Sequence, residues 1–270
     1  MTTAASGPVP GDVAHDAADP EAPAVETRRE RQRRETIEEI KSAARQHLTL
    51  EATSQLSLRA VARDVGLTPS AIYRYFQSQQ ELMAAVADDA YASAAAALRS
   101  SAEETEGHAV PDRLRALGHA YRRWAHEHKA EFNLIFSTDQ THPTGGDGVT
   151  NERVTEFFAV PVSIFVEAAH SGHVDLERVL IPRAPELTPS AARFAEHPDV
   201  DLTPEALNLL LSGWGAFHGF VMLELFGHLG RFYTDPEEAF DRHLVAILLA
   251  MGMTVDDTTP GVPRTRSLSG

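Results

Sequence analysis

The sequence has no cysteine, no long apolar run and no basic leader, and each absence excludes a class of protein. Without cysteine, the chain has no disulfides, no thiolate metal ligands and no thiol nucleophile. No window approaches the roughly 18 uninterrupted apolar residues of a membrane span. Residues 1–26 are dominated by Ala, Pro, Asp and Glu and lack the pattern of a signal peptide. The sequence therefore favours a cytoplasmic protein with no membrane partner.

The chain also lacks the sustained alternation of apolar and polar residues that β-strands show. Nearly every periodic segment is helical, so we expect an all-α fold with about nine main helices. The polar, Pro-rich ends, residues 1–26 and 254–270, are expected to be disordered. We find no phosphate-binding loop and no nucleophile elbow. We therefore assign no catalytic residue, no metal site and no cofactor.

Charge is distributed unevenly along this acidic chain. The formal net charge is -15, but residues 27–79 carry ten Lys and Arg against six acidic residues. Residues 80–270 carry fourteen basic residues against twenty-eight acidic ones. Affinity for nucleic acid depends on the charge at the contact face more than on the total. One basic region in an acidic chain is therefore compatible with a DNA partner.

Capping residues predict where the N-terminal helices begin. A first helix is expected over about 29–50, and Ser57 can cap a short second helix that ends near residue 65. Gly66 then supplies a tight turn. Thr68-Pro69 predicts the start of a third helix, because proline suits the first helical position. The capping box from Ser78 to Glu81 predicts a fourth helix over about 79–100.

The rest of the chain is predicted to be helical up to about residue 251, with one irregular stretch. Helices are expected from about 111, over 128–136, over 151–170, over 203–230 and over 235–251. Four prolines interrupt residues 173–203, which we expect to be mostly irregular apart from a short helix at Thr188-Pro189.

The segment from Leu58 to Tyr75 has the pattern of a helix-turn-helix. Ala62 allows two short helices to approach closely, Gly66 tolerates a left-handed turn, and Ile72 fills the small core between them. Outward-facing hydroxyls and guanidinium groups on the second of these helices can bond phosphates and base edges. The alternatives are half-buried packing for Tyr73 and Tyr75 and a solvated surface position for Arg59.

The run LSLRAVARDVGLTPSAIYRYF, from Leu56 to Phe76, resembles the N-terminal domain of TetR-family regulators. The resemblance implies a DNA-binding domain over 27–93, an effector-binding and dimerisation domain over 94–253, and a homodimeric repressor that a small-molecule effector releases from a palindromic operator. The family usually has a phosphate-binding lysine where this chain has Gln79. The candidate DNA-binding residues are Ser57, Arg59, Thr68, Pro69, Ser70, Ala71, Tyr73, Arg74, Tyr75 and Gln79.

Two apolar helix faces near the C-terminus predict a dimer interface, because two such helices from each subunit can form a four-helix bundle. The alternative is that they form only the core of one chain. The candidate interface residues are Leu207, Leu211, Val221, Leu225, Phe240, Leu244, Ile247, Leu248 and Met251.

An effector cavity is expected within the helical body. The segment from Gly213 to Gly219 resembles a Trp…His-Gly signature in the C-terminal domains of one TetR subfamily. Aromatic residues of the body can line an apolar cavity with His218 as its polar group; the alternative is an ordinary packed core. The candidate lining is Trp124, Phe132, Phe136, Phe157, Phe165, Trp214, Phe217, His218 and Met222.

Two rival functions remain open from the sequence. His119, His126, Glu127 and His128 could indicate an enzyme, but His126 and His128 face different sides of a helix and favour surface positions. A helical dimeric interaction protein without DNA affinity is the second rival. The exposed polar surface of residues 68–76 counts against it.

Overall fold

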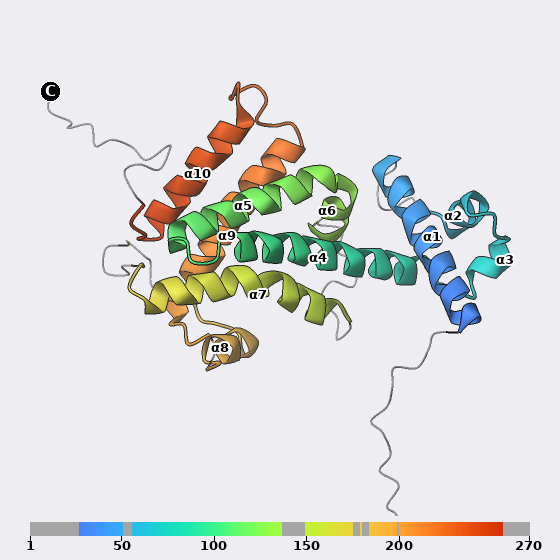
Figure 1. Cartoon of the computed structure of the whole chain (residues 1–270), viewed down its shortest axis with the longest axis horizontal. Coiled ribbons are helices and arrows are strands. Elements are labelled where there is room, and N and C mark those ends of the chain that lie inside the picture. The colour runs from blue at the N-terminus through green and yellow to red at the C-terminus, as the bar shows by residue number, and fades with distance from the viewer. Residues whose placement is uncertain are drawn as a thin grey trace, which may run out of the picture. The chain divides into compact units, whose positions relative to one another are not determined.

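A computed structural model of the chain describes residues 27–50, 56–136, 149–174, 179, 184–198 and 200–255. Within these residues the chain forms ten α-helices, nine of them with seven or more residues, and no strand (Figure 1). One isolated antiparallel bridge joins Val174 and Met253. The all-α prediction is confirmed. The predicted N-terminal tail lies outside the described residues, as does the C-terminal tail beyond residue 255.

The N-terminal helices begin where their caps predict. The structure has α1 (Arg28–Leu50), α2 (Leu58–Asp64), α3 (Pro69–Ile72) and α4 (Gln79–Glu104). The Ser78 hydroxyl accepts a hydrogen bond from the Glu81 amide at 3.1 Å, which confirms the cap of α4. Ser57 is the N-cap residue of α2, as predicted, but its side chain accepts no capping hydrogen bond. Since α4 runs unbroken past residue 93, the predicted domain boundary falls inside one helix.

The remaining helices are α5 (Val110–Glu127), α6 (Lys129–Phe136), α7 (Val149–His170), α8 (Pro189–Ala195), α9 (Pro204–Leu225) and α10 (Pro236–Ala250). The short helix predicted at Thr188-Pro189 is confirmed. The prediction that the long helix from 204 reaches residue 230 is wrong. It ends at Leu225 because Gly227 adopts φ 76°, a left-handed conformation that ends a helix.

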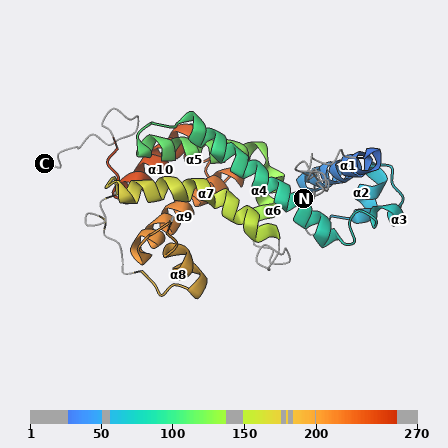
Figure 2. The same cartoon turned by 60° about the horizontal axis from the view of Figure 1, so that its bottom comes forward.

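Helices α4, α5 and α7 lie side by side in both cartoon views, and α9 pairs with α10 against α5 (Figures 1 and 2). Glycine permits one of these close approaches, since a Cβ built on Gly118 of α5 would lie 2.8 Å from both terminal methyls of Leu244 on α10. The result is a continuous apolar core in the body, the part of the chain from α5 to α10.

One described helix, α9, is long and apolar enough to cross a membrane by length and composition alone. A core helix of a soluble protein passes the same test. Its contacts with α5 and α10 give it a packing role within the chain.

Candidate nucleic-acid interface and effector region

The helix-turn-helix, residues 57–76, is built around a very small core. Val61, Ala62 and Ile72 are fully buried, and the amide of Leu67 donates to the Ala62 carbonyl at 2.7 Å across the turn. Gly66 adopts φ 69°, the left-handed conformation that the sequence predicts at this position. With so few buried atoms, the orientation of α3 depends on each of these contacts.

The start of α3 is fixed by Thr68. Its hydroxyl accepts from the Ala71 amide at 3.2 Å and lies 3.1 Å from the Ser70 hydroxyl, while Pro69 occupies the first turn. Thr68, Pro69 and Ser70 are all exposed. The cap therefore stabilises a helix start whose hydroxyls also face solvent.

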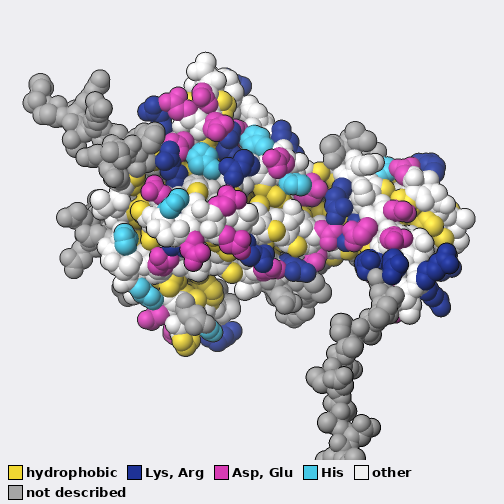
Figure 3. Space-filling model, in the orientation of Figure 1, with side chains coloured by type: hydrophobic (Ala, Val, Ile, Leu, Met, Phe, Trp, Pro, Cys, Tyr) yellow, Lys and Arg dark blue, Asp and Glu magenta, His cyan; other side chains and the backbone are white. Residues whose placement is uncertain are grey.

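The candidate DNA-binding residues fall into two groups by exposure. Tyr73 is 47% exposed, which argues against half-buried packing there. Tyr75 is half-buried, so the packing alternative holds at that position. Figure 3 shows several Lys and Arg side chains near the start of α1. The exposed residues are Ser57, Arg59, Thr68, Pro69, Ser70, Tyr73 and Arg74, and the half-exposed residues are Ala71, Tyr75 and Gln79.

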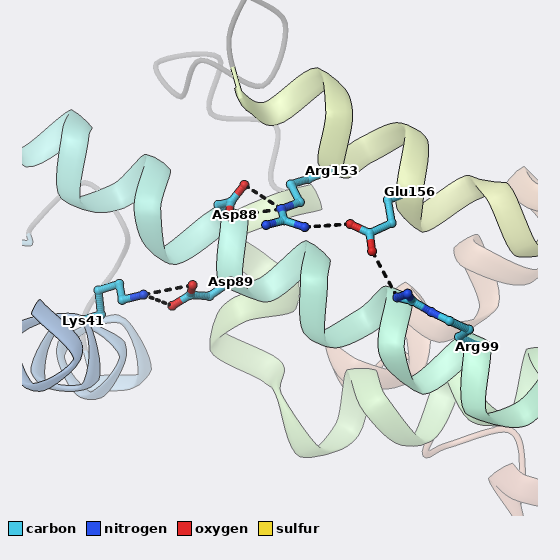
Figure 4. A network of polar contacts seen from close by, with 6 residues as sticks. All are labelled: Lys41, Asp88, Asp89, Arg99, Arg153 and Glu156. Carbon is cyan, nitrogen blue, oxygen red and sulfur yellow. Dashed lines mark hydrogen bonds and ion pairs between the residues drawn. The ribbon is translucent and has the colours of Figure 1, made fainter. Parts of the chain in front are cut away.

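An ion-pair cluster that the sequence did not predict joins α1 to α4 (Figure 4). Asp89 accepts from the ammonium of Lys41 at 3.0 Å and from the guanidinium of Arg45. Arg45 also lies 3.9 Å from Glu131 at the start of α6. Lys41 is only 8% exposed, and a buried ammonium needs such a partner. The sequence held one sign of this pair, because Lys41 stands among the apolar residues that line one side of the first helix.

A second cluster joins α4 to α7 from the residue next to Asp89. Arg153 donates to Asp88 at 3.1 Å and to Glu156 at 2.8 Å, and Glu156 also accepts from Arg99 at 3.1 Å (Figure 4). Neighbouring carboxylates on α4 thus bind two different helices, α1 and α7.

Most of the predicted effector-pocket residues meet in one aromatic cluster. Tyr121, which the sequence did not place in the pocket, lies at its centre, with ring centroids 5.4 Å from Trp214 and 5.5 Å from Phe217. Phe165 and Met222 share none of the described ring contacts. The buried members of the predicted set are Trp124, Phe132, Phe157 and Phe165, and the half-exposed members are Phe136, Trp214, Phe217, His218 and Met222.

One polar contact lies inside this cluster. The Tyr121 hydroxyl is 2.7 Å from Nδ1 of His218. Burial raises the pKa of Tyr121 well above its ordinary value and lowers the pKa of His218. Both shifts favour the uncharged forms of the two side chains.

A cavity of about 290 Å³ lies elsewhere, between α4 and α5. Of the predicted pocket residues, Trp124 lines it, together with serine, alanine and charged side chains of the two helices. The indole of Trp124 donates to Ser93 at 3.1 Å and separates this polar cavity from the aromatic cluster.

Two segments of the chain, one near each end, match known protein families. Residues 40–86 match the bacterial regulatory proteins of the tetR family, and residues 114–247 match the tetracyclin repressor-like C-terminal domain. An HTH-type transcriptional regulator of Mycobacterium tuberculosis, Rv1816, is 30% identical over 230 residues, which cover 81% of this chain and 94% of that protein. The chain belongs to the TetR family.

Solved structures agree with this assignment. The crystal structure of the regulatory protein SCO4313 has a TM-score of 0.60 and 29% identity, covering 82% of this chain and 99% of that one. A TetR-family regulatory protein from Rhodococcus RHA1 has a TM-score of 0.55 at 17% identity, covers 82% and 98% of the two chains, and shows the fold alone. This TetR-family chain is a helix-turn-helix, DNA-binding transcriptional regulator.

The dimer interface predicted for this TetR-family regulator needs correction. A side chain covered by its own chain cannot offer a surface to a second copy, and α9 and α10 bury most of the candidates against each other and α5. Leu211 is 56% exposed, while Leu225 and Ile247 are half-exposed. The buried candidates are Leu207, Val221, Phe240, Leu244, Leu248 and Met251.

The histidines that raised the enzyme alternative have structural partners in the regulator. His119 and Arg115 both bind Asp241, at 2.8 Å and 2.5 Å. His126 lies 3.3 Å from Glu224, which also accepts from Arg122 at 2.6 Å. These pairs lower the pKa of Asp241 and of Glu224, although burial opposes them.

The remaining histidine of that set, His128, stacks on Trp124 with ring centroids 5.7 Å apart. No group of metal-binding side chains occurs among the described residues.

Proposed function

We propose that this regulator is a homodimeric, cytoplasmic repressor, without enzymatic activity, that binds a palindromic operator and leaves it when a small-molecule effector binds the body. The observation that carries the DNA-binding part is the surface of α3, where exposed hydroxyls and Tyr73 stand on a helix start fixed by Thr68. Such groups form both phosphate and base-edge contacts.

The proposed DNA contacts come from the two short helices and the start of α4. Arg59 on α2 and Arg74 after α3 are exposed and supply positive charge. Gln79 can bond a phosphate but, being neutral, releases no counterion. The other proposed contacts are Ser57, Thr68, Pro69, Ser70, Ala71, Tyr73 and Tyr75.

The proposed dimer surface is the outer side of α9 and α10. On α9, a Cβ built on Gly215 or on Gly219 would meet nothing within 4 Å beyond the local backbone of the helix. Exposed Leu211 and Leu223 flank them, and Leu249 is exposed on α10. Small residues between leucines allow helices of two subunits to approach closely, as a four-helix bundle requires.

The proposed effector site is the aromatic cluster around Tyr121. It combines a large apolar area with one polar pair, the usual composition of a small-molecule site. An effector bound there would favour one spacing of the two α3 helices in the dimer and so change DNA affinity.

The test is a measurement of specific DNA binding by the full chain. Fragments selected from a random duplex library should converge on an inverted repeat whose half-sites lie about one helical turn apart. Sedimentation should show two chains per fragment. A chain that dimerises but selects no sequence would instead support the rival interaction protein.

A further inference from the structure

The burial of Tyr121 favours one proton arrangement for the Tyr121–His218 pair. Tyr121 is 1% exposed, and among the described residues its hydroxyl has one hydrogen-bond partner, Nδ1 of His218 at 2.7 Å. A buried O–H group must donate or stay unsatisfied, which is unfavourable. The Tyr121 hydroxyl therefore donates, and Nδ1 accepts.

A histidine that accepts at Nδ1 and is neutral carries its proton on Nε2. The lowered pKa of His218 keeps it neutral, since burial disfavours the charged ring. No described residue accepts a hydrogen bond from Nε2. His218 is half-exposed as a residue and its Nε2 has no acceptor among the described residues, so this donor can bind a molecule from solvent.

The surroundings of this donor are aromatic. The His218 ring is stacked with Trp214 and with Phe132, at centroid distances of 5.1 Å and 5.6 Å. The ring of Phe136 meets it at 61°, with the centroids 4.7 Å apart. Trp214 and Phe136 are themselves half-exposed. A planar ligand can therefore stack on exposed ring surface while it accepts one hydrogen bond.

Helix α9, which carries His218, has no Lys or Arg that could bind an anion. The charged residues of α9 are Glu205 and Glu224, and the carboxylate of Glu224 is already paired with Arg122. An uncharged acceptor avoids the cost of bringing an unpaired anion to a half-buried site.

We infer that His218 Nε2–H is the polar recognition group of the effector site, and that the effector is a planar, uncharged, largely aromatic molecule with a carbonyl-type acceptor. The inference rests on the proposed function, because it assigns the ligand class of the proposed effector site.

The test compares two probes of nearly equal shape, 2-acetonaphthone and 2-ethylnaphthalene, which differ by the carbonyl oxygen. Their dissociation constants are measured by equilibrium dialysis against the full chain without DNA. One hydrogen bond predicts about tenfold tighter binding of the ketone. The anion 2-naphthoate should bind no tighter than 2-acetonaphthone.

Two variants locate the effect. In Tyr121→Phe/His218→Phe both partners are removed together, so no buried polar group is orphaned, and the ketone should lose its tenfold advantage while 2-ethylnaphthalene still binds. In Tyr121→Phe alone, Nε2 can still carry the proton, so most of the advantage should remain. Nitrogen-15 NMR of the His218 ring should show the proton on Nε2.

The inference is overturned if the two neutral probes bind equally, if 2-acetonaphthone does not bind, or if 2-naphthoate binds more tightly than 2-acetonaphthone. It is also overturned if the ketone keeps its advantage in the double variant, or if NMR places the His218 proton on Nδ1. A separate mobility-shift assay of the probe-free protein on its operator tests the DNA-binding proposal, so the two can fail independently.

Discussion

Helices α3 and α8 begin with the same four residues, Thr-Pro-Ser-Ala, at 68–71 and at 188–191. Their local geometry is also the same. In each, the threonine hydroxyl accepts from the alanine amide, at 3.2 Å in α3 and 3.3 Å in α8, and lies 3.1 Å from the serine hydroxyl. The shared sequence therefore specifies a helix start in both places.

The residues after the shared start differ between the two helices. In α3 the start leads to buried Ile72 and then to exposed Tyr73 and Arg74, within the segment that matches the tetR family. In α8 it leads to Phe194 and buried Ala195, and the helix packs on α9. The comparison teaches that a cap determines a local conformation, whereas the neighbouring residues determine whether that conformation can bind DNA.

The largest expected effect is a loss of stability when the ion pair between α1 and α4 is broken. Asp89→Asn removes the carboxylate that binds the buried ammonium of Lys41, so the free energy of unfolding should fall by about 2 to 3 kcal/mol. The matched control is Asp88→Asn, whose partner Arg153 is 38% exposed, and which should cost clearly less because solvent screens an exposed ion pair. Chemical denaturation of both variants measures the difference, and equal losses would show that the Lys41 pair has no special role.

The next effect separates the two helices by function. Tyr73→Ala removes a proposed groove contact and should weaken operator binding by about 2 kcal/mol, roughly thirtyfold. Phe194→Ala removes a 40% exposed aromatic ring from α8 and should leave operator affinity unchanged. Fluorescence anisotropy with a labelled operator gives both values, with the dimer checked by sedimentation. A similar loss in Phe194→Ala would remove the distinction between the helices.

A smaller effect tests the shared cap. Thr68→Ala and Thr188→Ala each remove one capping acceptor and should each lower the free energy of unfolding by about 1 kcal/mol. Only Thr68→Ala should also weaken DNA binding. If urea titrations show that one threonine contributes nothing, the caps are not equivalent despite their matching geometry.

The smallest expected effect is a change in the salt dependence of DNA binding when one positive charge is added near α3 or at α8. Gln79→Lys supplies a cation where the family usually has one, so the slope of log affinity against log salt should steepen by about one unit. Ser190→Lys adds the same charge at α8 and should leave that slope unchanged. Titrations at several salt concentrations compare the two, and a steeper slope for Ser190→Lys would place α8 near the DNA.

The helix-turn-helix could be predicted almost completely from the sequence because its determinants are local. Gly66, the Thr68 cap and the Ser78 cap each act within a few residues, and all three appear in the structure as expected. The missed feature, the Lys41–Asp89 pair, joins residues 48 positions apart, and no short-range pattern encodes such a pairing.

The body was harder to predict because an apolar helix face does not specify what covers it. Phe240 and Val221 were expected to meet a second subunit, yet both are fully buried within one chain. The close contact between Gly118 and Leu244 shows how tightly α5 and α10 pack. Tyr121, the centre of the aromatic cluster, was overlooked because the rings around it come from three other helices, α6, α7 and α9.

The most direct test of the proposed DNA interface uses the absence of native cysteine. Ser70→Cys and Ser190→Cys each place one thiol at the same position of the shared Thr-Pro-Ser-Ala start, and each can carry the same photo-crosslinker. With the selected operator, the label at residue 70 should crosslink to the half-sites, whereas the label at residue 190 should leave the DNA unmodified. Crosslinking from residue 190 but not from residue 70 would contradict the assignment of α3 as the DNA-binding helix.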